Sequence, residues 1–280
     1  MLVTEYDLHF TMNELEVFTD RFPHVTKINT LSGKSDRILT NHGNIAQWVP
    51  DTHGTMRVAL ETKRGIGRTI HRDNAEAKWK PLPGMDWNDT TVRPLGIGSD
   101  NNTLYVKKKS PRGMWAVYPY DLTHKEFGEA VIVHEHYDII PEVWLSQANG
   151  IPFQNLIFSE RRELLGARYI TEFPRVVWFD EKLAQIQLAL NEALPRKINS
   201  ITSMSDDRKR MVVQSWTASD PGTYYLFDAE TSKLTPLLPR QPWIDPDKMA
   251  EVSAIKFKAR DGLLIHGYLT LPKGRGRKNL

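Results

Sequence analysis

The chain has 280 residues, of which 40% are hydrophobic and 25% are charged, and its formal net charge is +3. This composition is ordinary for a globular protein, and the length suits one large or two modest domains. The charge is too small to indicate a nucleic-acid partner, a function that would rest on the pI near 8.9 alone. Cysteine is absent, which excludes disulfides and thiol catalysis.

No apolar run approaches the ~18 residues of a membrane span, so we expect no membrane partner. The N-terminal segment MLVTEYDLHF lacks the layout of a signal peptide and reads directly into a strand pattern. The protein is expected to be cytoplasmic if Met1 is its true start. The alternative is that Met1 is an internal position with further sequence upstream.

A repeated unit runs through most of the chain. Each copy has an alternating apolar strand, an Asp or Asn, and a short polar turn that usually leads into another strand. The Asp or Asn residues serve as markers of the unit and are about 44 to 59 residues apart. They are Asn29, Asp73, Asp121, Asp180 and Asp228.

A second polar turn precedes each marker by about 20 to 22 residues. These turns are centred on Asp7, Asp51, Asp100, Glu160 and Asp206. Two turns at a fixed offset, in a unit of about 40 to 50 residues, are typical of a four-stranded propeller blade. A β-sandwich also has frequent turns but gives no reason for the double period. We therefore predict an all-β fold, with about five β-propeller blades over residues 1–246.

One long spacing between markers is explained by a helix. Leu183, Ile186 and Leu190 follow helical spacing, with Asp180 placed to cap the N-terminus and Pro195 to end the helix. We predict a helix at about residues 181–194, inserted in one blade, whose apolar stripe packs against the propeller.

Residues 247–280 are predicted to form a linker and a β-hairpin. Ile255, Phe257 and Ala259 alternate with polar residues, and a return strand begins near Leu264. Arg260, Asp261 and Gly262 form the predicted turn, since an Asp-Gly pair between two alternating runs is a strong hairpin signal. An isolated hairpin is marginal in water, so we expect it to join a sheet whose other strands lie beyond Leu280.

Three stretches resemble the prolyl oligopeptidase family of serine peptidases, and within it the dipeptidyl and acylaminoacyl peptidases. They are SDNNTLYV…WAVYPYDLTHKEFG, SDDRKRMVVQS…DPGTYYLFDAETSKLTPLL and RQPWIDPDKMAEVSAIKFKARDGLLIHGYLTLPKG. The most specific part is Pro242 to Gly274. In that family a propeller of typically seven blades caps an α/β-hydrolase domain.

The resemblance implies that the blades form an incomplete seven-bladed ring, and that residues 247–280 contain the first hairpin of a truncated α/β-hydrolase domain. That domain, expected C-terminal to the chain, would be the partner of the propeller. Peptides would be the substrates of the whole enzyme, and the propeller would restrict their entry to a Ser-His-Asp site.

The chain departs from this family in lacking any G-x-S-x-G motif, which carries the nucleophile. We therefore predict no catalytic, cofactor-binding or metal-binding residues in it, and no peptidase activity of the chain alone. The alternative is a free-standing β-propeller that acts as an interaction scaffold. The terminal hairpin discriminates between the two, because a scaffold has no use for it.

Other motifs are weaker. His134-Glu135-His136 could supply half of a metal site, but no third ligand is identifiable nearby, so a surface strand end is favoured. The G-x-G pairs at Gly65 and Gly96 lack the strand–helix context of a dinucleotide site and are read as turns. Two glycosylation sequons begin at Asn88 and Asn101. The eight tryptophans are expected to pack between blades.

Overall fold

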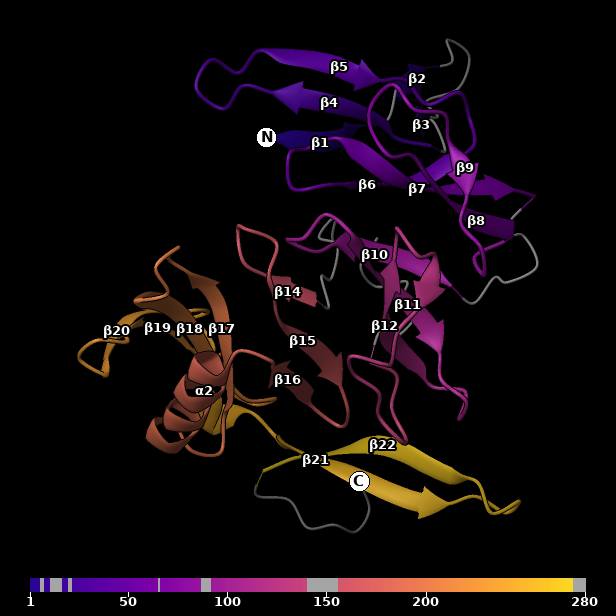
Figure 1. Ribbon diagram of the computed structural model, residues 1–280. Helices are drawn as coiled ribbons and strands as arrows, with labels where there is room; N and C mark the ends of the chain where they lie inside the picture. Colours follow the sequence, from indigo (N-terminus) through magenta and orange to yellow (C-terminus); the bar gives the residue numbers. More distant parts are fainter. Residues whose placement is uncertain are drawn as a thin grey trace. The chain divides into compact units, whose positions relative to one another are not determined.

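The computed structural model describes residues 1–5, 8–10, 17–19, 22–64, 66–86, 92–139 and 156–273 (Figure 1). These residues form antiparallel sheets and one α-helix longer than a single turn, which confirms the all-β prediction. Within these ranges no helix is both long and apolar enough to cross a membrane. The chain divides into two compact units, Met1–Leu164 and Leu165–Leu280, and each is described by itself.

The first unit contains three sheets, a short hairpin and a strand near its end. The first sheet has the order β1 (Leu2–Glu5), β4 (His24–Ile28), β5 (Ser35–Leu39). The second joins β6 (Ile45–Pro50), β7 (Met56–Lys63), β8 (Ile66–His71) and β9 (Lys80–Pro81). The third joins β10 (Arg93–Ile97), β11 (Thr103–Lys109), β12 (Trp115–Asp121) and β13 (Glu126–Phe127). The hairpin is β2 (Leu8–Phe10) with β3 (Val17–Thr19), and the last strand is β14 (Leu156–Phe158).

The second unit contains a four-stranded sheet, two hairpins and the helix. β15 (Leu164–Ile170) pairs with β16 (Pro174–Trp178), and α2 (Glu181–Ala193) follows. The sheet joins β17 (Ile198–Met204), β18 (Arg210–Trp216), β19 (Thr223–Asp228) and β20 (Lys233–Pro239). A 3-10 turn, η1 (Pro246–Lys248), leads to the hairpin of β21 (Glu251–Lys258) and β22 (Leu264–Leu271).

The predicted blades correspond to these meander sheets, three of which have four strands. After Asp180 the predicted helix takes the place of the strand that follows the other markers. Leu183, Ile186 and Leu190 form the buried stripe of this helix, α2, which follows β16 directly. The predicted domain boundary at 246/247 stays a prediction.

The turns after the markers are closed by side-chain oxygens that accept backbone N–H groups. Asn29, Asp121 and Asp228 each accept hydrogen bonds of 2.7–3.1 Å from the amides two and three residues further along. Such bonds satisfy turn amides that no strand can pair. At the marker Asp73 the acceptor is the next residue, Asn74, whose side-chain oxygen accepts the Glu76 and Ala77 N–H groups.

The earlier turns use the same chemistry. Asp51 and Asp100 each accept two backbone N–H groups at 2.9–3.0 Å. The turn expected near Asp7 lies outside the described residues. At the turns predicted around Glu160 and Asp206, the hydroxyl of the preceding serine accepts a backbone N–H: Ser159 from Glu163 and Ser205 from Arg210. In the second turn the Asp207 carboxylate also accepts the Lys209 N–H at 3.0 Å.

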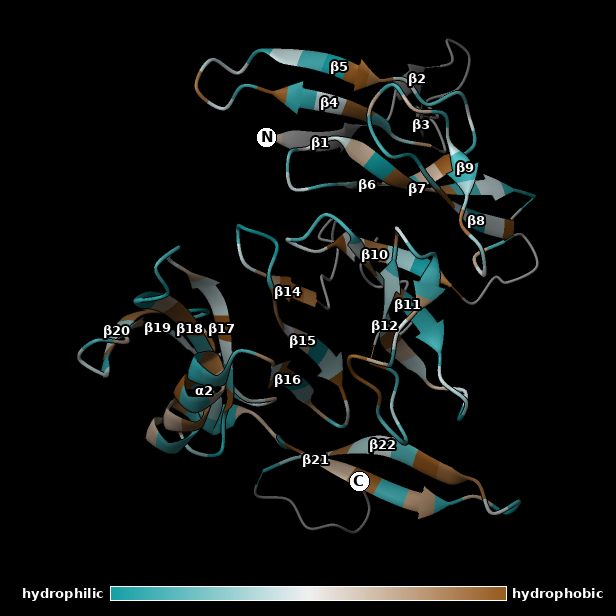
Figure 2. Cartoon of the chain, in the orientation of Figure 1, coloured by the Kyte–Doolittle hydropathy of each residue, from teal (hydrophilic) through white to brown (hydrophobic). Residues whose placement is uncertain are grey.

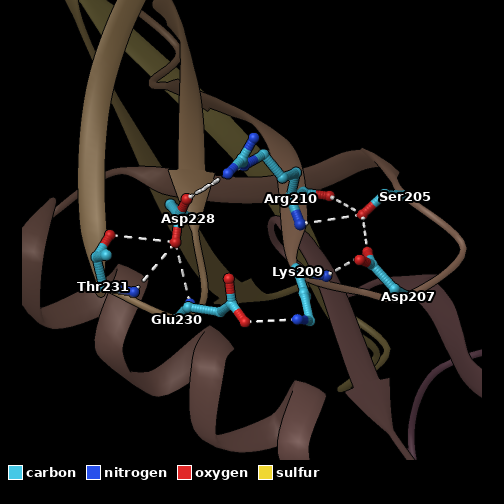
Figure 3. A network of polar contacts seen from close by, with 7 residues as sticks. All are labelled: Ser205, Asp207, Lys209, Arg210, Asp228, Glu230 and Thr231. Atoms are coloured by element: carbon cyan, nitrogen blue, oxygen red, sulfur yellow. Dashed lines mark hydrogen bonds and ion pairs between the residues drawn. The ribbon is translucent and has the colours of Figure 1, made fainter.

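The fixed offset has a structural cause that Figure 3 shows in the β17–β20 sheet. The β17–β18 turn and the β19–β20 turn lie at the same end of the sheet, because β18 and β19 run away from that end and return to it. Arg210 pairs with Asp228 at 3.1 Å, and Lys209 pairs with Glu230 at 2.5 Å. The offset is therefore the length of two strands and the turn between them.

The largest core lies between the β6–β9 and β10–β13 sheets. It combines strand residues of both sheets with the segment that connects them, and its members are at most 4% exposed. They include Val49, Val58, Leu82, Met85, Val92, Ile97, Leu104, Val106, Tyr120 and Leu122. Packing between consecutive four-stranded sheets is the arrangement expected of neighbouring blades.

The tryptophans only partly follow the packing expectation. Trp48 and Trp79 pack together over Ile45, Ala59 and Ile70, with ring centroids 5.9 Å apart. Trp115 is also buried. Trp243, by contrast, is 75% exposed, so it is not a packing residue within the described chain. Trp87 and Trp144 lie outside the described residues.

Helix α2 begins where Asp180 caps it. Its Oδ1 accepts the Leu183 N–H at 2.9 Å, and its Oδ2 pairs with the Arg208 guanidinium at 2.6 Å. The cap and the buried stripe confirm the predicted helix, which ends at Ala193. The carboxylate thus joins the helix to the β17–β18 turn.

We expect Asp180→Ala to lower the free energy of unfolding by about 1–2 kcal/mol, the usual cost of a lost N-cap. Asp180→Asn keeps a capping oxygen and loses only the ion pair with Arg208, so it should cost less than about 1 kcal/mol. Urea unfolding of both variants measures the difference. Equal losses would contradict the assignment of Asp180 as a cap.

His71, at the end of β8, is 6% exposed. Burial, together with the nearby Arg57 guanidinium, lowers the pKa of His71 to about 4. In the unfolded chain the pKa of the same imidazole is about 6.5. Below that pH the unfolded chain binds a proton that the folded chain does not, so His71 reduces stability progressively as the pH falls towards 4.

Between pH 6.5 and 4, His71 should lower the free energy of unfolding by up to roughly 3 kcal/mol. We expect His71→Asn to flatten the pH dependence of the unfolding free energy in that window. His124 acts in the opposite sense, because its hydrogen bond to Asp121 raises its pKa, and it is unchanged in the variant. Parallel curves for the two proteins would contradict the burial of a neutral His71.

Candidate functional site

The β21–β22 hairpin exposes several large apolar side chains. Its register runs from Glu251 opposite Leu271 to Lys258 opposite Leu264. Phe257, Tyr268 and Leu269 are 52%, 59% and 41% exposed. Figure 2 shows hydrophobic residues along both strands.

The predicted turn residues Arg260, Asp261 and Gly262 lie between the two strands. Ala259 N–H donates to the Leu263 carbonyl at 2.8 Å, and the Asp261 carboxylate accepts the Leu263 N–H at 3.0 Å. Gly262 has φ +85°, a left-handed conformation that glycine adopts without strain. The turn is therefore longer than a two-residue Asp-Gly turn and shifts the pairing by one residue.

That shift decides which side chains share a face. A two-residue turn at Asp261-Gly262 would have placed Tyr268 opposite Ile255, whereas the structure places Gly267 there and Ile265 opposite Phe257. Because a one-residue slip exchanges the two faces of a strand, the return strand contributes a different set. One face, the apolar face, carries Ile255, Phe257, Ile265, Leu269 and Leu271.

The opposite, polar face carries Lys256, His266 and Tyr268 beside the apolar Val252, Ala254 and Leu264, and it contacts the β15–β16 turn. Glu172 in that turn forms an ion pair with the Lys256 ammonium and lies 3.8 Å from His266 Nδ1. The Tyr268 hydroxyl donates to the Glu172 carbonyl oxygen. The Phe173 and Tyr268 rings are 6.4 Å apart at 65°. Glu172 thus anchors the polar face of the hairpin to the β15–β16 turn.

The other sequence candidates do not assemble a site. Glu135 pairs with Arg112, which lowers the pKa of that carboxyl, and His134 Nδ1 accepts the His136 N–H at 3.1 Å. No group of three metal-ligating side chains occurs within the described ranges. The interpretation of the G-x-G pairs as turns was wrong for Gly67 and Gly96, which lie in β8 and β10. Gly98 lies in the β10–β11 turn, where its N–H donates to the Thr103 carbonyl at 2.8 Å.

Of the remaining motifs, Gly65 and the sequon at Asn88 lie outside the described residues. Asn101, which begins the other sequon, has its side chain bound to Thr52 in the neighbouring turn. Sequence reasoning missed Glu172 altogether. Nothing in its local sequence distinguishes it, because its partners are on strands far along the chain.

Comparison with known proteins matches this chain to peptidases both in sequence and in structure. Dipeptidyl aminopeptidase BIII of Pseudoxanthomonas mexicana is 22% identical over 256 residues, which are 91% of this chain and 35% of that protein. A Mycobacterium tuberculosis puromycin-hydrolyzing peptidase has a structure with TM-score 0.58 and 14% identity, covering 96% of this chain and 44% of that one. The chain is similar to peptidases of the prolyl oligopeptidase type.

The chain spans about a third of the length of this curated relative, and its fold is that of the β-rich, propeller-containing part of such peptidases. Ribosomal RNA small subunit methyltransferase A of Pelagibacter ubique (strain HTCC1062) is also 22% identical, over 220 residues, or 73% of this chain and 82% of that protein. The structural match is also to a peptidase, in agreement with the first of these two relatives. No protein-family model matches the chain.

If Glu172 holds the hairpin, Glu172→Ala should free it from the β15–β16 turn. We expect tryptic cleavage after Lys248 and Lys258 to accelerate several-fold, because the ion pair with Lys256 and the contact to His266 are lost. Glu163→Ala, which removes an exposed acid from a different turn, serves as the matched control. Unchanged cleavage in Glu172→Ala would mean that the hairpin is held by other contacts.

Proposed function

We propose that this chain is the substrate-gating β-propeller portion of a serine peptidase of the prolyl oligopeptidase type. In this proposal the blades admit short or unstructured peptides and exclude folded proteins. The peptide bond is cleaved in an α/β-hydrolase domain to which β21 and β22 belong. The similarity of 91% of the chain to part of a dipeptidyl aminopeptidase supports the assignment to this class of enzyme.

The single observation that carries the proposal is the apolar face of the hairpin. Phe257 and Leu269 are about half exposed there, and a two-stranded sheet is marginal in water by itself. Burying such side chains stabilises a fold by about 1.5–3 kcal/mol each. A further sheet or helix layer laid on this face would recover that free energy, as the hydrolase domain of the proposal does.

The alternative is a free-standing propeller that acts as an interaction scaffold. A scaffold needs the blades but has no role for a two-stranded extension that leaves large apolar side chains in water. The hairpin therefore favours the peptidase proposal over the scaffold.

A fluorophosphonate probe tests the proposal, because it labels activated serine nucleophiles. The native polypeptide that carries this sequence, isolated with antibodies raised against the 280-residue chain, should be labelled and should cleave short peptides but not folded proteins. The 280-residue chain alone should not be labelled. Unlabelled native polypeptide, or stoichiometric labelling of the chain alone, would refute the proposal.

Substitutions at two neighbouring positions of the native polypeptide test the two faces of the hairpin separately. Phe257→Asp places a charge on the apolar face and should reduce fluorophosphonate labelling at least tenfold, since a buried unpaired carboxylate costs several kcal/mol. Lys258→Asp introduces the same group on the polar face and should leave labelling within about twofold. Equal effects would contradict the proposal that the apolar face, and not the polar face, lies against the hydrolase domain.

A further inference from the structure

The first unit contains a small, positively charged cavity that neither the fold nor the proposed function uses. It has a volume of about 80 Å³ and lies where the end of β8, the β8–β9 connection and the turn after β12 meet. Its lining includes six charged or titratable side chains. They are His71, Arg72, Asp73, Lys78, Lys80 and Lys125.

The charges in this lining do not cancel. Asp73 is the one carboxylate among the lining residues, against one guanidinium and three ammonium groups. Within the described chain, Lys78, Lys80 and Lys125 form no ion pair with a carboxylate, although surface lysines commonly find one. The site therefore carries an excess of positive charge with its ammonium donors uncommitted.

Arg72 is fixed at the cavity wall. Its Nε donates to the Met56 carbonyl at 2.7 Å, and its Nη1 donates to the Ala75 carbonyl at 2.6 Å. The guanidinium also lies over the Trp79 ring, 4.6 Å from the centroid. A guanidinium held by three such contacts loses little conformational entropy when a ligand binds beside it.

His71 adds a buried donor whose tautomer is determined by its neighbour. Its Nε2 lies 3.2 Å from the Arg57 guanidinium, which can only donate, so Nε2 accepts and the ring proton is on Nδ1. Nδ1 is 3.9 Å from the Asp73 carboxylate, beyond hydrogen-bond distance. The Nδ1–H of this buried, cavity-lining side chain therefore has no protein acceptor at hydrogen-bond distance among the described residues.

We propose that this cavity binds a phosphate-type oxyanion, either inorganic phosphate or the phosphoryl group of a small phosphorylated molecule. The ammonium groups of Lys78, Lys80 and Lys125 supply charge, and His71 Nδ1–H supplies a directed neutral donor. A volume of about 80 Å³ is larger than a single water molecule needs and has room for one tetrahedral oxyanion.

Titration of the 280-residue chain with inorganic phosphate at constant ionic strength, followed by calorimetry, tests the proposal. We expect saturable binding at one site per chain. Lys125→Gln should weaken it roughly fivefold, and Asp73→Asn should strengthen it, because the variants remove an attractive and a repulsive charge. Lys34→Gln, which removes an exposed lysine elsewhere in the same unit, should leave it unchanged.

Absence of saturable binding, or equal weakening by Lys34→Gln and Lys125→Gln, would overturn the proposal and indicate general surface electrostatics. Glycerol phosphate in place of inorganic phosphate identifies the source of the ligand. Binding of both with similar affinity assigns the site to a phosphoryl group, and binding of inorganic phosphate alone assigns it to the free ion. Lys125 is exposed, so its substitution leaves the fold intact.

Discussion

The hydrogen bonds that close the turns are the constraint on which the rest of this structure depends. A meander of antiparallel strands must reverse direction every few residues, and the amides at each reversal cannot reach another strand. Here a side-chain oxygen of Asp, Asn or Ser accepts them, as at Asp121 and Asp228. Hydrogen bonds to these amides also lower the pKa of Asp228, so the turns are strongest when the carboxylates are ionised.

The type of turn also sets the register of the hairpin, and the register determines which side chains share a face. The Ala259–Leu263 turn pairs Phe257 with Ile265, and this pairing gives the β21–β22 hairpin one apolar and one polar face. The polar face is held by Glu172, which leaves the apolar face for a further layer of protein. In the proposed peptidase, the propeller and the catalytic domain would therefore be joined by a hairpin that contacts both, with a different chemistry on each face.

Much of the fold could be predicted because its signals are local. Asp180 as a cap and Leu183 as a buried helix residue follow from spacing within one turn of helix. The register of the hairpin could not be predicted, because Asp261-Gly262 is compatible with a two-residue and with a longer turn. Glu172 and the cavity near Lys125 were also beyond sequence reasoning, since each depends on strands that meet only in the folded sheets.

Hydrogen exchange on β21 and β22 tests most directly whether the apolar face belongs under another domain. In the 280-residue chain the amides of Val252–Lys258 and Leu264–Leu271 should exchange orders of magnitude faster than those of β11 and β18. In a native polypeptide that contains the proposed hydrolase domain, the same amides should be protected as well as those of β18. Slow exchange of the hairpin in the 280-residue chain alone would contradict the account, because its apolar face would then already be covered.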